Sequence, residues 1–351
     1  MSTISTSARQ FYYPVIGQGW SQLKQRTVPV PTPKSSEVLV KIHAVSLQHR
    51  DLSIAKGAYP PSTLPADLIP GSDMAGEIVG LGDDILNGPF KLGDRVCANF
   101  STSYLSGDPE DDFWQYAQGG NSHGVLTDYK TYKPEALVSI PAHLSYEEAS
   151  TLPCAAVTAY NGLTGGRRPL KAGDTVLVMG TGGVSIFGLQ FAVASGATVI
   201  VTSSSDAKLA YAKKLGATHG INYTTTPAWE DEVLALTSGK GVDHILEVTG
   251  GSIIQSLKAV KMAGQISIIG ALASGAGENI LRSVIRKGAI LRGITVGSVE
   301  KFKDMNRLIE ANPEKTRPVV DKVFGFDQVI EAFDYLQSQK HVGKVVVSLS
   351  Q

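Results

Sequence analysis

The sequence predicts an α/β protein in which a β-rich N-terminal region precedes a doubly wound parallel sheet. Short apolar segments bounded by glycine and proline fill roughly the first 140 residues, which is typical of β-strands. From Ser145 onward, apolar strands alternate with helical segments, and this order favours parallel strands joined by right-handed crossovers. The 37 glycines and the hydrophobic content of 42% fit such a fold with many tight turns.

The balanced charge of the 351 residues argues against several classes of partner. Lys and Arg number 32, as do Asp and Glu, and no basic block suggests binding to nucleic acid or to an anionic membrane. Two cysteines, Cys97 and Cys154, are too few for a disulfide framework and favour a reducing compartment. No apolar signal core begins the chain, and no window reaches the roughly 18 apolar residues that span a bilayer. We therefore expect a cytoplasmic protein with no membrane partner.

The β-rich region contains three clear strand signals and two long irregular stretches. The segment 37–45 alternates apolar and polar residues, and further short strands are expected at 74–79 and 95–99. The irregular stretches cover 55–70 and 101–121, and the second carries an acidic cluster. These stretches are either surface loops bordering a cleft or solvated insertions.

The second region begins with a capping box at Ser145–Glu148, which opens a helix. Strands and helices then alternate as a doubly wound sheet requires: strands at 175–179, 198–202, 243–248 and 265–270, with helices at 186–194, 207–215 and 253–262. Beyond about residue 295 the alternation stops. We expect the helices at 301–310 and 326–337 and the strands at 318–324 and 344–349 to return to the first region.

A glycine-rich turn joins the first of these parallel strands to its helix. Gly180 permits a tight turn, and Gly182 lets the backbone approach a pyrophosphate, which the N–H groups and dipole of the following helix attract. The usual third glycine is Ser185. The pattern predicts a dinucleotide-binding turn lined by Thr181, Gly182, Gly183 and Val184.

The end of the second parallel strand favours NADP(H) over NAD. An NAD-binding sheet carries Asp or Glu there, and this chain has Ser203, Ser204 and Ser205, with Lys208 five residues past Ser203. Hydroxyl and ammonium groups can bind a 2′-phosphate that a carboxylate would repel. The serines can also cap the next helix, and both roles are compatible. Ligands of such sheets bind at the carboxyl ends of the strands, and a later strand ends at Gly270, Ala271 and Leu272.

Several dispersed motifs together resemble the medium-chain dehydrogenases/reductases, and the resemblance covers nearly the whole chain. It is carried by Glu37–Asp51, Gly71–Gly80, Gly93–Val96, Leu152–Tyr160, Gly241–Asp243, Gly293–Ser298 and Gly343–Lys344, in the family's order and spacing. The chain is similar to the zinc-independent, quinone-oxidoreductase-like branch. The resemblance implies a GroES-like catalytic domain formed by 1–145 and 295–351, with a Rossmann cofactor-binding domain at 146–294.

The resemblance also implies cofactor contacts and a partner. Thr158 would lie near the phosphates or ribose, although it can be an ordinary helix residue, and Tyr223 matches a contact to the 2′-phosphate in relatives that use NADPH. Further contacts implied near the nicotinamide are Val296, Gly297, Ser298 and Lys344, the last of which can equally be a surface lysine. The family suggests a homodimer joined through the edge strands, with 289–296 as the candidate segment unless it is buried within the subunit.

The chain departs from the zinc-dependent members at their ligand positions. Gln48 stands where these enzymes have cysteine, and the neutral amide is a poor zinc ligand. Their Gly-His-Glu is Gly71-Ser72-Asp73, so the imidazole is missing, and Cys154 alone cannot hold zinc. No cysteine lies between Cys97 and Cys154 to form a structural zinc loop. We expect a metal-free enzyme, although His49 and Asp73 could in principle rebuild a site.

The turn after the first long strand supplies the candidate catalytic residues. Gln48 could donate to an acceptor carbonyl, and His49 could hold the ribose, relay a proton or be purely structural. Asp51 is expected to orient its neighbours. The resemblance places Tyr59 in the loop that the family uses beside the substrate, where its hydroxyl could hydrogen-bond the carbonyl or its ring could simply pack.

Loss of the Lewis acid favours reduction of an already polarised acceptor over oxidation of an alcohol. We therefore expect an NADPH-dependent reductase of quinones, enones or similar conjugated carbonyls. Two alternatives remain open: an enoyl reductase of a biosynthetic pathway, and a cofactor-binding protein with little catalysis.

Overall fold

The computed structural model of the protein describes residues 5–59, 63–86, 88–270 and 280–350, and it consists of two compact units. Unit 1 comprises Met1–Cys154, Gly297–Arg307 and Pro318–Gln351, and unit 2 comprises Ala155–Val296 and Leu308–Arg317. The chain passes from unit 1 to unit 2 after Cys154 and returns to unit 1 after Val296. These positions lie nine and two residues beyond the expected domain limits of 145 and 294. The short segment Leu308–Arg317 groups with unit 2, which the sequence did not indicate.

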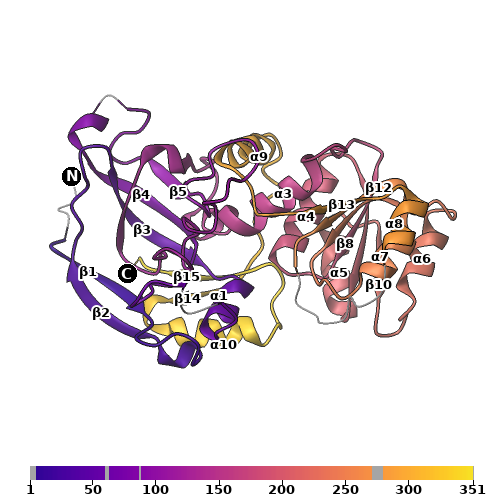
Figure 1. The fold of residues 1–351 in the computed structure, drawn as a ribbon, viewed down its shortest axis with the longest axis horizontal. Coiled ribbons are helices and arrows are strands. Elements are labelled where there is room, and N and C mark those ends of the chain that lie inside the picture. The colour runs from indigo at the N-terminus through magenta and orange to yellow at the C-terminus, as the bar shows by residue number, and fades with distance from the viewer. Residues whose placement is uncertain (1–4, 60–62, 87, 271–279, 351) are drawn as a thin grey trace. The chain divides into compact units, whose positions relative to one another are not determined.

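Unit 1 is built on a seven-stranded sheet with the order β14-β15-β3-β4-β5-β7, in which β6 also pairs with β3 (Figure 1). The strands are β3 (Val38–Ser46), β4 (Asp73–Leu81), β5 (Arg95–Ala98), β6 (Tyr129–Tyr132), β7 (Leu137–Ser139), β14 (Val320–Gly325) and β15 (Lys344–Ser348). Because β15 pairs antiparallel with β3, the C-terminal tail returns to the first region, as the sequence predicted. A separate antiparallel pair is formed by β1 (Ser7–Tyr12) and β2 (Lys24–Pro29).

Helices enclose the core of unit 1. The helix α10 (Val329–Gln337) packs against β14, β15 and α1 (His49–Ala55), and α2 (Tyr146–Ala149) packs against β3 and β4. Apolar side chains of β3, such as Val40 and Ile42, are buried together with Phe333 of α10. The strand β3 is buried along most of its length, so the turn that follows it starts from a rigid support.

Unit 2 contains a six-stranded parallel sheet with the order β10-β9-β8-β11-β12-β13. The strands are β8 (Thr175–Met179), β9 (Thr198–Ser203), β10 (His219–Asn222), β11 (Val242–Glu247), β12 (Val260–Ile268) and β13 (Ile290–Gly293). The strand order reverses between β8 and β11, and ligands of doubly wound sheets bind at such a switch point. The predicted Rossmann sheet is confirmed, and the glycine turn follows β8 at this point.

The helices of unit 2 form layers on the sheet (Figure 1). The helix α3 packs on α4, and α7 packs on both α6 and α8. Their bounds are α3 (Val157–Thr164), α4 (Gly183–Ala194), α5 (Asp206–Lys214), α6 (Trp229–Leu236), α7 (Ile253–Ala259) and α8 (Leu281–Lys287). The helix α9 (Val299–Ala311) runs from unit 1 into the segment that groups with unit 2. Among the described residues, no helix is both long and apolar enough to cross a membrane.

One predicted helix is shorter than its sequence pattern suggested. The segment 253–262 was expected to be helical throughout, but α7 ends at Ala259. Val260 instead begins β12 and pairs with Val242 of β11. Tertiary pairing with a buried neighbouring strand overrides the local helical periodicity here.

Candidate functional site

The turn between β3 and α1 contains Gln48, and the first turn of α1 contains His49 and Asp51, which are three of the four predicted catalytic residues. Gln48 is extended and precedes the first residue of α1, and its backbone N–H donates to Asp51 Oδ2 at 2.7 Å. Asp51 thus caps its own helix and fixes the turn. Gln48 and Asp51 are both buried, and burial raises the pKa of Asp51.

Asp73 connects this turn to two other parts of unit 1. It begins β4 and lies opposite Ser46 of β3. Its carboxylate accepts hydrogen bonds from Gln48 Nε2, from Ser72 Oγ at 2.5 Å and from the backbone N–H of Cys154 at 3.1 Å. The fold therefore joins Gln48, Ser72 and Cys154 through one fully buried carboxylate.

Lys344 supplies positive charge to the same buried group. It is the first residue of β15, only 4% of its surface is exposed, and its ammonium donates to the backbone carbonyl of Leu47. Burial lowers the pKa of Lys344, and the nearby charge of Asp73 opposes that shift. Burial raises the pKa of Asp73 to about 6, with Lys344 again acting in the opposite direction. The predicted contact of Lys344 with the nicotinamide stays a prediction.

The residues at the family's zinc-ligand positions do not fit that metal. The Gln48 amide nitrogen and the Ser72 hydroxyl donate hydrogen bonds to Asp73 and cannot at the same time act as anionic ligands. Burial raises the pKa of Cys154, which opposes the thiolate that zinc requires. In the part of the chain that the structure describes, no group of three or more His, Cys, Asp or Glu side chains could hold a metal ion.

His49 and Tyr59 are less tightly held than Gln48. His49 is exposed at its surface, and its Nδ1 lies 3.5 Å from Ser53 Oγ. Desolvation by the protein around the rest of the ring, together with the charge of Lys56, lowers the pKa of His49. The Arg50 guanidinium lies 5.5 Å from the centroid of the Tyr59 ring and donates to the carbonyl of Gln118 at 2.8 Å. Arg50, which the sequence analysis did not single out, therefore ties the catalytic turn both to Tyr59 and to the long irregular segment.

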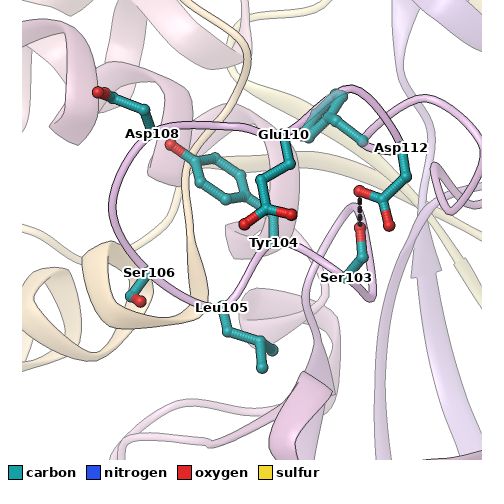
Figure 2. Close-up of a pocket in the computed structure, with 8 residues that line it drawn as sticks. Ser103, Tyr104, Leu105, Ser106, Asp108, Glu110 and Asp112 are labelled. Carbon is teal, nitrogen blue, oxygen red and sulfur yellow. Dashed lines mark hydrogen bonds between the residues drawn. The ribbon is translucent and has the colours of Figure 1, made fainter.

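The irregular segment 101–121 encloses a cavity of about 260 Å³ in unit 1 (Figure 2). Three acidic side chains surround it, and Ser103 Oγ donates to Asp112 at 3.3 Å. Tyr104 and Phe113 of the same segment are buried. Part of the segment therefore packs against the protein, and the segment is not only a solvated insertion. Of the predicted site residues that the structure describes, none lines this cavity.

In unit 2, the backbone of the glycine turn can be compared with what a dinucleotide-binding turn needs. Gly180 adopts a φ of 75° and donates its N–H to the carbonyl of Thr202 at 2.8 Å. A Cβ atom on Gly182 would meet no atom within 4 Å, so the missing side chain leaves open space before α4. Thr181, Gly183 and Val184 lie in the same turn. These residues fit a bound pyrophosphate.

Ser185 explains how the turn tolerates the lost third glycine. Its hydroxyl donates to the carbonyl of Met179, the last residue of β8, at 2.7 Å. Close contact between helix and sheet is provided one turn later, where a Cβ atom on Gly188 would collide with Leu246. The packing role of the family's third glycine therefore belongs to Gly188.

The structure brings the predicted 2′-phosphate residues to one end of β9. The backbone N–H of Tyr223 donates to the carbonyl of Ser203 at 3.1 Å, and the Tyr223 side chain is 43% exposed. Ser204 is exposed, and Ser205 Oγ accepts the backbone N–H of Lys208 at 3.4 Å. Ser205 therefore has the helix-capping role, which leaves Ser204 accessible to a ligand.

The remaining predicted cofactor residues lie on three segments. Thr158 is buried on α3, and Gly270 follows β12, but Ala271 and Leu272 lie outside the described residues. Ser298 is buried, and its hydroxyl accepts the N–H of Lys301 at 3.2 Å, so it caps α9. Gly297 accepts a hydrogen bond from Asn99 Nδ2 at 3.2 Å.

Models of two protein families match the chain. Residues 34–142 match the alcohol dehydrogenase GroES-like domain, and residues 183–311 match the zinc-binding dehydrogenase family. Among solved structures, the chain is similar to one from Sinorhizobium meliloti 1021, provisionally described as an alcohol dehydrogenase, with 36% identity, a TM-score of 0.89, and coverage of 99% and 100% of the two chains. The quinone oxidoreductase from Coxiella burnetii is 25% identical, with a TM-score of 0.78 and coverage of 98% and 100%.

Curated relatives cover nearly the whole chain. The zinc-type alcohol dehydrogenase-like protein C1773.06c of Schizosaccharomyces pombe is 50% identical over 94% of this chain and 96% of its own. The chloroplastic NADPH-dependent alkenal/one oxidoreductase of Arabidopsis thaliana is 28% identical over 92% and 75%. The NAD-dependent alcohol dehydrogenase of Sulfurisphaera tokodaii is 28% identical over 93% and 96%. With the two-unit fold and the glycine turn, these similarities show that the chain belongs to the medium-chain dehydrogenase/reductase family of pyridine-nucleotide oxidoreductases.

Proposed function

We propose that this protein is an NADPH-dependent, metal-free reductase of quinones, enones or similar conjugated carbonyl acceptors. The observation that carries the proposal is the buried group of Gln48, Asp73 and Lys344. The Gln48 amide donates to Asp73 at a position where zinc-dependent relatives have a metal ligand, and the Lys344 ammonium donates to the carbonyl of the neighbouring residue Leu47. NADPH supplies the hydride when bound. A conjugated carbonyl is already polarised and needs less assistance than an alcohol that must lose a proton.

Gln48 is the residue best placed to polarise the acceptor. Its carboxamide has two N–H donors, of which Asp73 takes one, so the other can donate to the acceptor oxygen. Asp73 is itself held by Ser72 and by the backbone of Cys154, which keeps the carboxamide from rotating. The positive charge of Lys344 offsets the buried carboxylates and so reduces repulsion of the negative charge that develops on the acceptor.

His49 and Tyr59 are proposed to act at the acceptor and its surroundings. Partial burial lowers the pKa of His49, which favours a neutral imidazole that can accept or relay a proton at neutral pH. The Tyr59 hydroxyl could donate to the acceptor carbonyl, with the nearby Arg50 guanidinium limiting the motion of the ring. Asp51 keeps the turn in place and does not act as the acid.

NADPH is proposed to extend along the carboxyl edge of the parallel sheet. Its pyrophosphate would lie on the Gly180–Val184 turn, and its 2′-phosphate near Ser203, Ser204, Lys208 and Tyr223. Thr158, Gly270, Ala271, Leu272, Val296, Gly297, Ser298 and Lys344 are proposed as further contacts. The NADPH dependence of the Arabidopsis relative supports this preference, and the NAD dependence of the Sulfurisphaera relative opposes it.

Steady-state kinetics test the proposal. The purified protein is assayed with NADPH and NADH against small enones, quinones and enoyl thioesters. We expect a higher kcat/KM with NADPH and turnover of at least one small conjugated carbonyl. Turnover restricted to thioesters would favour a biosynthetic enoyl reductase, and tight NADPH binding without any turnover would indicate a binding protein.

We also propose that the protein is a homodimer joined at the edge of the parallel sheet, and that it acts in the cytosol. The strand β13 ends the sheet, and the adjacent helix α8 exposes Ile285 and Leu281 by 79% and 65%. These side chains are one helical turn apart and form an apolar surface on the helix that precedes β13, the last strand of the sheet in the described part of the chain. Sedimentation velocity should give a dimer, and Ile285→Glu should shift it toward monomer. A wild-type monomer at micromolar concentration would refute the dimer.

A further inference from the structure

Val296 has a backbone conformation that its residue type disfavours. Its φ is 51°, in the left-handed region. Among the described non-glycine residues with positive φ, Val296 is the only one with a β-branched side chain. Such conformations persist only where the surrounding structure enforces them, and they are concentrated at functional sites.

Asn161 of α3 provides the enforcing contact. Its side-chain Nδ2 donates to the carbonyl of Val296 at 2.7 Å, and Asn161 is only 4% exposed. This hydrogen bond is partly buried, and breaking it would leave the Asn161 amide, which is shielded from water, without its acceptor. The contact lies wholly within unit 2, of which Val296 is the last residue before the chain crosses to unit 1.

Arg292 determines which way the Asn161 amide points. Arg292 Nη2 donates to Asn161 Oδ1 at 2.8 Å, and Nη1 donates to the Asn161 backbone carbonyl, also at 2.8 Å. Since guanidinium nitrogens only donate, Oδ1 must face Arg292 and Nδ2 must face Val296. Gly165 leaves room for this arrangement, because a Cβ atom there would collide with Asn161 Oδ1.

We propose that Asn161, oriented by Arg292, is a positioning residue that holds Val296 left-handed and thereby sets the path of the Val296–Ser298 backbone for the carboxamide of the nicotinamide. The inference rests on the proposed function, which places the cofactor at this segment. It adds a residue pair to which the sequence analysis gave no role. Neither Asn161 nor Arg292 needs to touch the cofactor.

The test compares three variants by direct titration with NADPH and by thermal unfolding. Asn161→Ala should weaken NADPH binding about tenfold, because Val296 can then relax to negative φ. Val296→Gly in the same background should restore the dissociation constant to within about threefold of the wild type, since glycine adopts positive φ without the steric penalty. Val296→Ala is the matched control: it also removes the branched side chain but keeps the preference for negative φ, so it should not rescue binding.

The outcomes separate this inference from the proposed function. If Asn161→Ala binds NADPH as tightly as the wild type, or if glycine and alanine at position 296 rescue equally, Asn161 does not act through the Val296 backbone and the inference is wrong. A purely structural Asn161 would lower the Tm without rescue by glycine, and this result would also overturn it. A wild-type protein that binds neither NADPH nor NADH would overturn the proposed function and the inference with it.

Discussion

Replacing Asp73 by asparagine should remove a large pH dependence of stability. Asp73 is fully buried, and burial raises its pKa from an ordinary 3.8 to about 6 in the folded protein. The native state therefore keeps its proton between these values while the unfolded chain has lost it. At about 1.4 kcal/mol per pKa unit, the wild type should lose about 2 kcal/mol of unfolding free energy as the pH rises from about 4 to 7. The asparagine side chain cannot ionise, so the variant should lack this loss.

Urea unfolding, repeated at intervals of 0.5 pH unit between pH 4 and pH 8, measures how the unfolding free energy depends on pH. The difference in unfolding free energy, wild type minus Asp73→Asn, cancels most other titrations and should fall as the pH rises. The exposed Asp84→Asn variant controls for the loss of a carboxylate elsewhere. A difference that stays flat, or that grows with pH, would show that Lys344 keeps Asp73 ionised and that burial does not dominate its pKa.

Three further predictions concern the acceptor site, the cofactor and the fold. Gln48→Ala and Tyr59→Phe should each lower kcat by the equivalent of about 1–3 kcal/mol per lost hydrogen bond, and unchanged kinetics in both would remove these residues from the mechanism. Ser204→Asp should lower kcat/KM for NADPH at least tenfold, by repulsion of the 2′-phosphate, while leaving that for NADH nearly intact; equal losses would contradict the assignment. Gly188→Ala should destabilise the protein by about 1–3 kcal/mol in urea unfolding, since its Cβ atom would collide with Leu246; a neutral result would mean that this helix can shift.

The parallel sheet could be predicted because its signals are local. The four strands that were predicted, β8, β9, β11 and β12, each contain a short apolar run, and the glycine turn marks the switch point within ten residues of sequence. The end of α7 could not be predicted in the same way, because the pairing of Val260 with Val242 depends on a neighbouring strand and not on helical periodicity. The helix α8 was missed because it is short, and β13 was anticipated only as the candidate edge segment 289–296 that the family resemblance implied.

The candidate site likewise contains residues that local sequence patterns predict and residues that only long-range contacts bring together. The Gln48 turn and the serines after β9 are short sequence patterns, so their residues could be named in advance. The buried group around Asp73 depends on contacts between residues up to 297 positions apart, such as that of Lys344 with Leu47. Asn161 and Arg292 belong to no recognisable motif, and only the left-handed backbone of Val296 draws attention to them.

A single-turnover experiment tests the central claim most directly. The protein is dialysed against a chelator, its metal content is determined, and a stoichiometric amount of NADPH is mixed with excess enone while absorbance at the nicotinamide band is followed. We predict full oxidation of the NADPH by protein that contains far less than one metal ion per chain. Oxidation that occurs only after Zn²⁺ is restored would contradict the claim that hydrogen-bond donors of the chain replace the metal.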